Sequence, residues 1–512
     1  MTNVRKREWC DCLSVRDGQL FIEECNALDL VQEFGSPLFV LSEQQLRDNI
    51  KEFKRAFTQE WPYGEVDVLP AFKANCTLAS RKILSDEGAG ADIYSEGELI
   101  GVLKCGTQPE LISVNGGGKS EAFIRKCIKA GVRITVEDLD EPELINRIAQ
   151  ALGKKAKIRF RMKPNFPNLY KRTDFSPEYV SIDLGIQIYK SGIPAQYLPE
   201  LGKKVLAMEG VELVGLHFHA GRHHQSLWYW RGLMKQYAAL VAELCQIWGQ
   251  NGCPFKLQEL DIGGGYASLR DPLNRLELGK DVIFTWLTWP ILQGLRLLSS
   301  KWRYKMYSLL IKTMARDPYP GYAPRIRDYA QAAAGTFRRE LEKYNLDLTG
   351  IRLQIEPGRC LYGNTGIHLT TVKKVKTQTQ PMAMNWILTD TTCFFLNGGT
   401  YEYNFHDFVV ANKVNDKACQ VADIVGHSCY ADRILPLVNV PDVKEKDVIA
   451  ILETGAYQEV SASNFNALPR PATVLVSNHS AELIKRSETV DDVFARDIIP
   501  RRLNKETTCE ED

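Results

Sequence analysis

Short runs of apolar and β-branched residues recur along the first part of the chain, and amphipathic segments separate most of them. Such runs are typical of strands buried on both faces of a sheet. Helical patterns such as Ser120–Ala130 and Glu141–Leu152 lie between them. The eight predicted strands are Val66–Leu69, Ala91–Tyr94, Leu111–Val114, Arg133–Val136, Lys157–Met162, Leu213–His219, Glu259–Ile262 and Arg352–Ile355. Eight strands alternating with helices predict an α/β fold with a (β/α)8 barrel of the TIM type, and an open doubly wound sheet is the alternative.

The pattern changes after about residue 365, where strand-like runs follow one another with few helices between them. This texture predicts a C-terminal all-β domain with strands at Ile367–Val375, Trp386–Thr389, Val448–Leu452 and Thr473–Val476. The first residues also look extended, and we expect them to pair with that domain. The predicted domains are an N-terminal segment (1–38), the barrel (39–364), the β-domain (365–485) and a charged tail (486–512) in which 490–498 form a short helix.

The predicted barrel carries an insertion at about residues 270–330, because roughly 90 residues separate its seventh and eighth strands. Within it, Val282–Leu298 is almost continuously apolar. Its 17 residues are marginal for crossing a bilayer, and Pro290 and Arg296 argue further against a span. We expect a helical insertion packed on the barrel. A helix that lies on a membrane surface or docks on a partner is the alternative.

Composition and charge indicate a soluble globular protein. Hydrophobic residues make up 44% and charged residues 25% of the chain. Since 64 basic residues balance 63 acidic ones, we expect neither a nucleic-acid nor a membrane partner. The 13 scattered cysteines, and the lack of an apolar run in Met1–Cys10, predict a cytoplasmic location. Cys10 and Cys12 have no second pair at zinc spacing, so no metal site is predicted.

Unusual residues fall at the ends of predicted strands, where the mouth of a barrel forms. The first strand runs into Ala71-Phe72-Lys73-Ala74-Asn75. A lysine is costly to bury as an ammonium, and that cost disappears if the amine forms a Schiff base with an aldehyde. A plain rim charge is the alternative. The sixth strand carries His217 and His219 on one side, which indicates a metal site with His223 or His224, or a ring stacked on a planar cofactor.

The seventh and eighth strands end in motifs that suit an anion. Gly263, Gly264 and Gly265 let the backbone approach a ligand closely, at a position where barrels commonly hold phosphate. A simple tight turn is the alternative. Glu356-Pro357-Gly358-Arg359 places an acid and a base on a stiff turn, which would otherwise be an ion pair that holds the turn.

Taken in order, these motifs resemble the fold-type III pyridoxal-phosphate decarboxylases, the family of diaminopimelate and ornithine decarboxylases. The likeness extends from about residue 36 to about residue 476 and fits the diaminopimelate branch best near its end. It rests on Ala71–Asn75, Phe218–Gly221, Asp261–Gly265, Glu356–Arg359, and Gly455–Tyr457 with the Asn464-Phe465-Asn466 and Pro469-Arg470-Pro471 that follow.

The resemblance implies that Lys73 carries pyridoxal 5′-phosphate (PLP) as a Schiff base and that decarboxylation passes through a quinonoid intermediate. His219 would stack on the pyridine face. Glu356 would keep the pyridine nitrogen protonated, so that the ring accepts the carbanion left by CO₂. The implied cofactor contacts are Lys73, Asp92, His219, Gly263, Gly264, Gly265, Glu356, Gly358, Arg359 and Tyr457.

The resemblance also implies a homodimer with shared active sites. Cys429 looks like the family's cysteine that the partner subunit donates to deliver a proton, a role that suits the acidity of a thiol. A buried structural cysteine is the alternative. The implied contacts with a small amino-acid substrate are Arg359, Tyr430, Asp432 and Tyr457.

Three positions depart from the family's pattern. Arg222 stands where the family usually has serine, and Tyr430 follows Cys429 where an acid normally reads the distal amine. The stretch Phe394–Tyr401 lacks the arginine that grips the distal carboxylate of diaminopimelate. These changes leave cofactor binding intact. We therefore expect the substrate to be a diaminopimelate-type amino acid or a modified or carrier-linked relative.

Two other functions compete with decarboxylation. The first is an alanine-racemase-like PLP enzyme, but such racemases place an arginine against the pyridine nitrogen, and Glu356 favours decarboxylation. The second is a catalytically inactive relative that binds a partner, which the presence of Lys73, Glu356, Arg359 and Tyr457 argues against.

Overall fold

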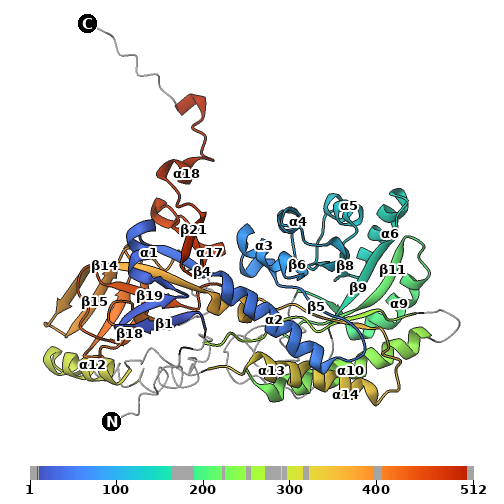
Figure 1. The fold of residues 1–512 in the computed structure, drawn as a ribbon, viewed down its shortest axis with the longest axis horizontal. Coiled ribbons are helices and arrows are strands. Elements are labelled where there is room, and N and C mark those ends of the chain that lie inside the picture. Colours follow the sequence, from blue (N-terminus) through green and yellow to red (C-terminus); the bar gives the residue numbers. More distant parts are fainter. Residues whose placement is uncertain are drawn as a thin grey trace, which may run out of the picture.

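The computed structural model describes residues 9, 11–163, 190–221, 225–249, 255–270, 290, 294, 297–314, 322–396 and 406–503. Two lobes lie side by side, one built around parallel strands and one around a mostly antiparallel sheet, and the long helix α2 (Glu43–Glu60) runs between them (Figure 1). The parallel lobe is the predicted barrel, and the other lobe is rich in β-strands.

The parallel lobe is a nearly closed eight-stranded barrel. Its strands follow one another around the sheet in the order β5-β13-β12-β11-β9-β8-β7-β6. The first and last strands meet through a parallel bridge between Ala71 and Asp92, and Asp92 N donates to Pro70 O at 3.2 Å. This closure confirms the predicted barrel and excludes the open doubly wound sheet. The strands are β5 (Val66–Val68), β6 (Ala91–Ile93), β7 (Ile112–Val114), β8 (Arg133–Val136), β9 (Ala156–Lys163), β11 (Val211–His217), β12 (Glu259–Asp261) and β13 (Arg352–Ile355).

Helices cover the outside of the barrel, and local sequence signals set their ends. Helix α5 begins after Ser120, whose Oγ accepts a hydrogen bond from Phe123 N at 3.2 Å, and it ends at Gly131, which has φ +76°. Its buried residues Phe123, Ile124, Cys127 and Ile128 form one apolar face. The other barrel helices are α3 (Leu78–Asp86), α4 (Glu96–Lys104), α6 (Glu141–Ala151), α9 (Leu198–Leu206), α10 (Leu227–Gly249), α13 (Ile326–Ala330) and α14 (Thr336–Glu342).

The β-rich lobe is organised by one long strand. Strand β14 (Gly366–Gln378) pairs with β15 at its far half and with β4 and β19 at its near half. Strand β4 (Leu38–Ser42) joins this sheet from the N-terminal side, and α2 follows it directly. The remaining strands are β15 (Met384–Thr389), β16 (Phe408–Val410), β17 (Gln420–Val425), β18 (Arg433–Val440), β19 (Val448–Leu452), β20 (Ala472–Ser477) and β21 (Ser480–Lys485).

The N-terminal segment packs on the β-rich lobe. Strands β1 (Leu13–Arg16), β2 (Gln19–Ile22) and β3 (Cys25–Asn26) form a small antiparallel sheet. Their buried residues Leu13, Leu20 and Ile22 share a core with residues of β14 and β19. Residues Ala27–Phe34 form helix α1 rather than the extended chain that we expected. The predicted domain boundaries themselves stay a prediction.

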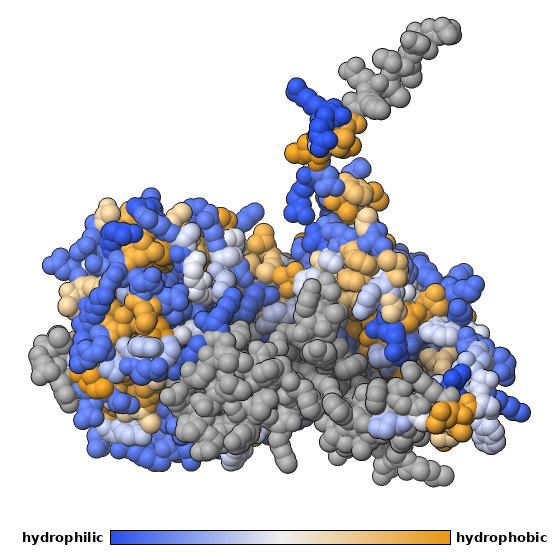
Figure 2. Space-filling view, turned by 180° about the vertical axis from the view of Figure 1, so that it is seen from behind, coloured by the Kyte–Doolittle hydropathy of each residue, from blue (hydrophilic) through white to orange (hydrophobic). Residues whose placement is uncertain are grey.

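Two segments extend from these lobes. The C-terminal end of the described chain projects away from the body, and its hydrophobic residues are exposed among charged ones (Figures 1 and 2). It contains helix α18 (Val490–Phe494), where a short helix was predicted. The predicted insertion contributes helix α12 (Ser300–Met314), which lies beside the β-rich lobe and not on the barrel as expected (Figure 1). Most of Val282–Leu298 lies outside the described residues. Among the described helices, we find none that is both long and apolar enough to cross a bilayer.

Candidate active site

Lys73 lies just beyond the end of β5, in the single turn Phe72–Ala74. Its Nζ is 3.0 Å from Oδ2 of Asp92, the middle residue of β6. The lysine side chain is 52% exposed, whereas that of Asp92 is 5% exposed, so the amine sits at an accessible mouth above a buried acid. Desolvation lowers the pKa of Lys73, but the charge of Asp92 and the hydrogen bond to it outweigh this effect and hold that pKa above its usual value.

Asn115 connects this ion pair to a second acid. It follows β7, and its Nδ2 donates to Asp92 Oδ1 at 2.6 Å and to Glu356 Oε1 at 2.7 Å. Glu356 directly follows β13, which is separated from β7 by β5 and β6 around the barrel. A buried amide that serves both carboxylates fixes their relative position, because each donor N–H has one oxygen to satisfy. A single hydrogen-bonded path therefore runs from Lys73 to Glu356.

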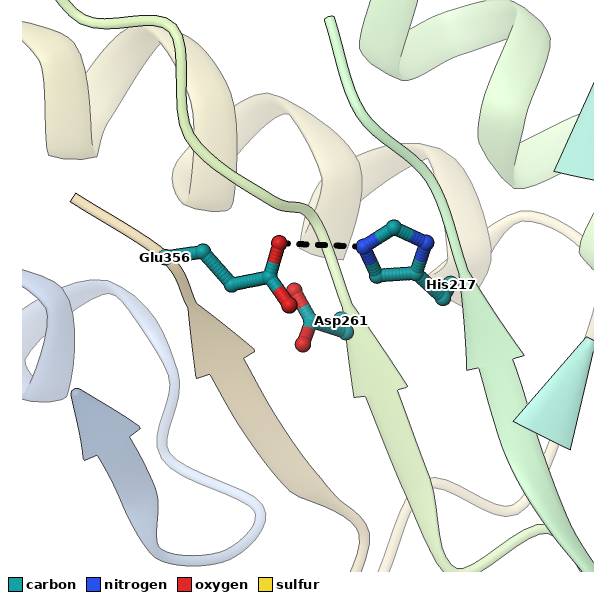
Figure 3. A group of neighbouring side chains, drawn as sticks. All are labelled: His217, Asp261 and Glu356. Carbon is teal, nitrogen blue, oxygen red and sulfur yellow. Dashed lines mark hydrogen bonds and ion pairs between the residues drawn. The ribbon is translucent and has the colours of Figure 1, made fainter. Parts of the chain in front are cut away.

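Glu356 is the centre of a buried network that neighbouring strands supply. Its Oε2 lies 3.1 Å from His217 Nε2 on β11, and its Oε1 lies 3.1 Å from Arg159 Nη2 on β9. Arg159 Nη1 is 2.7 Å from Oδ2 of Asp261 on β12. Figure 3 shows His217, Asp261 and Glu356 converging from adjacent strands. Arg159 and Asp261 are fully buried, so their charges compensate each other away from water.

Burial governs the protonation of this network. It raises the pKa of Glu356, and the nearby charge of Asp92 raises it further, while Arg159 and Asn115 act in the opposite direction. It raises the pKa of Asp261 to about 6. It lowers the pKa of His217 to about 3, so this imidazole is neutral near pH 7. The permanent positive charge beside the two acids is therefore the Arg159 guanidinium.

His217, Asp261 and Glu356 have ligand atoms within 4.8 Å of one another, which is close enough to hold a metal ion. However, the guanidinium of Arg159 already contacts both carboxylates, and it would repel a second cation. The two histidines also diverge in their contacts, since His217 bonds Glu356 while His219 Nδ1 accepts from Gly264 N at 3.3 Å. An arginine-centred ion network explains this cluster better than a metal site does.

The glycine-rich loop after β12 packs against its neighbours too closely for side chains. A Cβ on Gly263 would lie 2.4 Å from Phe218 O, and one on Gly264 would lie 2.1 Å from Glu356 O. Gly263 and Gly265 also have positive φ angles, of +66° and +107°. The loop also holds the His219 ring through Gly264. Burial, followed by the charges of Arg161 and Lys73, lowers the pKa of His219 well below its usual value.

A residue of the β-rich lobe reaches the barrel mouth beside Lys73. Tyr457 N donates to Ala74 O at 2.7 Å, and the Tyr457 ring lies 4.7 Å from Cζ of Arg359. A Cβ on Gly358 would lie 2.9 Å from Tyr457 Oη. Gly358 and Arg359 follow β13, so the turn of the eighth strand, the Tyr457 hydroxyl and the turn of Lys73 are brought together.

The Cys429 loop (residues 426–432) differs from this mouth because it faces outward. Cys429 is exposed, which contradicts the alternative of a buried structural cysteine, and its N–H donates to Asn466 Oδ1 at 2.8 Å. Tyr430 is 61% exposed, and its ring lies edge-on to Phe394 at 5.7 Å. Phe394 in turn stacks on Phe465 at 4.0 Å.

Asp432 is buried in the same loop, and its carboxylate accepts hydrogen bonds from backbone N–H groups. Oδ1 accepts from Cys393 N at 2.7 Å and Oδ2 accepts from Ser428 N at 2.9 Å. Asp432 therefore holds the loop in shape, and its predicted contact with a substrate stays a prediction. Arg222, His223, His224 and residues 397–401 of the Phe394–Tyr401 stretch lie outside the described residues.

Two residues of the network, Asn115 and Arg159, were not among the sequence candidates. The sequence nevertheless contains an indication for each of them. Arg159 lies within a predicted buried strand, where a charge requires a partner. Asn115 follows a predicted strand end and precedes three glycines, which is the same position relative to the mouth as the residues that were chosen.

The residues at the mouth fit the cofactor that the resemblance implies. Lys73 offers an accessible amine for an aldehyde, and Glu356 offers a buried acid for a pyridine nitrogen. Gly263 and Gly264 let the loop pack closely against Glu356, at the start of the turn that carries Arg359. Their N–H groups already donate to Asp261 Oδ1 and His219 Nδ1, so the matched partner for phosphate is the Arg359 guanidinium. Each functional group of PLP therefore has a chemically matched partner in this site.

Comparison with known proteins agrees with this geometry. Residues 44–284 match the pyridoxal binding domain of the pyridoxal-dependent decarboxylases. The diaminopimelate decarboxylase of Archaeoglobus fulgidus is 28% identical over 96% of this chain and 99% of its own length, and that of Aquifex aeolicus is 29% identical over 95% and 97%. The crystal structure of the Methanocaldococcus jannaschii diaminopimelate decarboxylase superposes with a TM-score of 0.77 at 26% identity, over 96% of this chain and 99% of that one. The chain is therefore similar, over almost its whole length and in its fold, to the PLP-dependent diaminopimelate decarboxylases.

Proposed function

We propose that this decarboxylase binds PLP through Lys73 and directs it with the buried network around Glu356. The observation that carries the proposal is the unbroken path from Lys73 through Asp92 and Asn115 to Glu356. When bound, PLP supplies an electron sink for the electron pair that remains after CO₂ leaves. The chain's own residues hold the sink in place and control its charge.

Glu356 and its neighbours set that charge. Burial and the charge of Asp92 raise the pKa of Glu356, so its carboxylate is poised to share a proton with a basic ring nitrogen. Arg159 and Asn115 lower the pKa of Glu356 and so favour its ionised form. His217 adds no charge, because its pKa is about 3. Asp92 holds the Lys73 ammonium until it is consumed. His219 would cover the ring face, and the glycine loop, Gly358, Arg359 and Tyr457 would hold the phosphate.

The active site is proposed to be completed by a second copy of the chain. Cys429 is exposed on the outward-facing loop, which suits a thiol that delivers a proton to a partner's site. Such sharing implies a homodimer with two equivalent active sites. We also propose a cytoplasmic location, which suits the free thiols found throughout the described part of the chain.

The proposed substrate is a diaminopimelate-type amino acid or a relative whose distal ammonium is masked, with contacts from Arg359, Tyr430, Asp432 and Tyr457. The relatives named above are diaminopimelate decarboxylases, which supports the first part. The aromatic group of Phe394, Tyr430 and Phe465 supports the second, because its rings offer no carboxylate to a distal ammonium.

A comparison of CO₂ release from two compounds tests this proposal. The purified protein with PLP is given meso-diaminopimelate and its derivative acylated on the distal amine, and the two kcat/KM values are compared. A kcat/KM for the acylated compound equal to or above that for the free one supports a masked distal group. Release from meso-diaminopimelate alone assigns the unmodified substrate, and release from neither overturns the substrate proposal. The Lys73→Ala variant controls for release that does not need the site.

A further inference from the structure

The insertion contains a local excess of basic residues, whereas the chain as a whole is nearly balanced in charge. Between Val282 and Arg316 the sequence contains six basic residues and no acidic one, although acidic and basic residues are nearly equal in number over the whole chain. Four of the six lie within helix α12 (Ser300–Met314). The local excess therefore belongs to this segment, and the net charge of the whole chain conceals it.

Helix α12 exposes apolar and basic residues on the same face. Lys301, Trp302, Lys305 and Leu309 are exposed, and their spacing places them on one side of an α-helix. Trp302 is 58% and Leu309 is 56% exposed, and Lys305 Nζ lies 5.0 Å from the Trp302 ring. The residues between them, such as Tyr304 and Tyr307, are half-buried on the opposite side.

The turn before the helix adds further exposed apolar residues, and the helix lies at the edge of the molecule (Figure 1). Leu297 is 91% and Leu298 is 45% exposed immediately before α12. The helix lies at the lower left periphery of the β-rich lobe, remote from the barrel (Figure 1). Large apolar side chains that stay exposed beside lysines need an environment that accepts both.

An anionic bilayer surface is such an environment. Tryptophan and leucine insert at the boundary between headgroups and acyl chains, while lysines stay at the level of the phosphates. A nucleic acid would accept the lysines but leave Leu297, Leu298 and Leu309 in water. The centres of protein interfaces are depleted in lysine. On α12, by contrast, Lys305 lies beside Trp302 on the exposed face.

We propose that α12 docks this enzyme on a membrane surface that contains anionic phospholipid. The helix lies on the bilayer and does not cross it. The proposal revises the expectation, drawn from net charge, that a membrane is not a partner. It stands independently of the decarboxylase substrate, because no residue of the active site takes part.

Vesicle binding of the full-length PLP-loaded protein tests the proposal. Sedimentation is measured with vesicles of phosphatidylcholine alone and of phosphatidylcholine mixed with phosphatidylglycerol. We expect binding only to the mixed vesicles and its loss in high salt, since the attraction to anionic lipid is electrostatic. The Lys301→Glu/Lys305→Glu variant should bind at least about tenfold more weakly. The Lys54→Glu/Lys155→Glu variant, with the same charge change on exposed barrel positions, should bind like wild type.

Further measurements make each alternative visible. Trp302→Ala and Leu309→Ala should each weaken binding to mixed vesicles without changing decarboxylase activity. Equal binding to both vesicle types, or none to either, overturns the proposal. Binding of a duplex DNA probe but not of vesicles assigns a polyanion site instead. A change of oligomeric state in the Lys301→Glu/Lys305→Glu variant, measured by light scattering, assigns α12 to an interface between copies of the chain.

Discussion

The barrel mouth and the Cys429 loop place their chemically reactive residues in opposite environments. At the mouth, charged residues such as Arg159, Asp261 and Glu356 are buried, and each is held by another charged residue from a different strand. In the loop, Cys429 and Tyr430 are exposed, and the buried acid Asp432 is used by backbone N–H groups.

The difference shows which part of the site one chain can complete alone. The residues proposed to hold PLP at the mouth come from a single chain, so we expect cofactor binding to depend on packing within that chain. The reactive groups of the loop face outward, so their use depends on what approaches them. Substitutions at the mouth should therefore change the binding or the charge of the cofactor. Substitutions in the loop should change the active site of a partner subunit.

The largest effect is expected at Lys73. Lys73→Ala should lower kcat by several orders of magnitude, because both covalent attachment and positioning of PLP go with the amine. Borohydride reduction of the wild-type protein, followed by peptide mapping, should place the cofactor on Lys73. An adduct on another lysine would contradict Lys73 as the point of attachment.

A smaller loss is expected when the mouth keeps its cofactor but changes its charge. Glu356→Gln should retain PLP absorbance and lower kcat about 10²-fold, because an amide does not hold the ring nitrogen protonated. Glu356→Asp, which keeps the acid, is the matched control and should be less impaired. A kcat for Glu356→Gln within about twofold of wild type would contradict the role of this acid.

The loop is tested by mixing two inactive proteins. If Cys429 acts in the partner's site, heterodimers of Lys73→Ala and Cys429→Ala contain one intact site and one doubly altered site. After random exchange about a quarter of all sites are intact, so the mixture should exceed both parents. Mass spectrometry of the mixture establishes that heterodimers have formed. Parental activity despite exchange would show that the Cys429 loop does not serve a partner.

The smallest effect concerns stability and pH. The pKa of His217 is about 3 in the folded protein and about 6.5 in an unfolded chain, so between these values the unfolded state binds more protons. Stability is therefore lost as pH falls below about 6.5, by up to about 1.4 kcal/mol per pH unit. The advantage of wild type over His217→Gln in thermal unfolding should shrink from pH 7 to pH 5. The exposed His479→Gln variant is the control for loss of an imidazole elsewhere on the protein.

The barrel was predictable because its strands are buried on both faces. Runs such as Val66–Leu69 and Arg352–Ile355 were predicted within a residue of their observed bounds, because short groups of apolar and β-branched residues mark them even though each also contains polar residues. The pairing of strands that lie far apart in the chain was not readable from these runs. The barrel hypothesis supplied it, and the Ala71–Asp92 bridge confirmed it.

The site was predictable where a motif marks a strand end, and not where a partner is distant in sequence. Lys73 and Glu356 stand out because each lies in a distinctive turn. Asn115 is meaningful only once β6, β7 and β13 are assembled, because its two acceptors come from the first and the last of these strands. Arg159 has the same character, since its charge is explained by acids about 100 and 200 residues away.

The Ala71–Asp92 bridge couples the assembly of the barrel to the capture of its cofactor. It joins a residue two positions before Lys73 to the acid that holds the Lys73 amine. A folding intermediate in which this seam is open would lack the site, so PLP can bind only the closed form. By mass action the cofactor then stabilises the closed ring, and loss of PLP would remove that stabilisation. Hydrogen exchange at the Asp92 amide, which donates across the seam to Pro70, would report the opening directly.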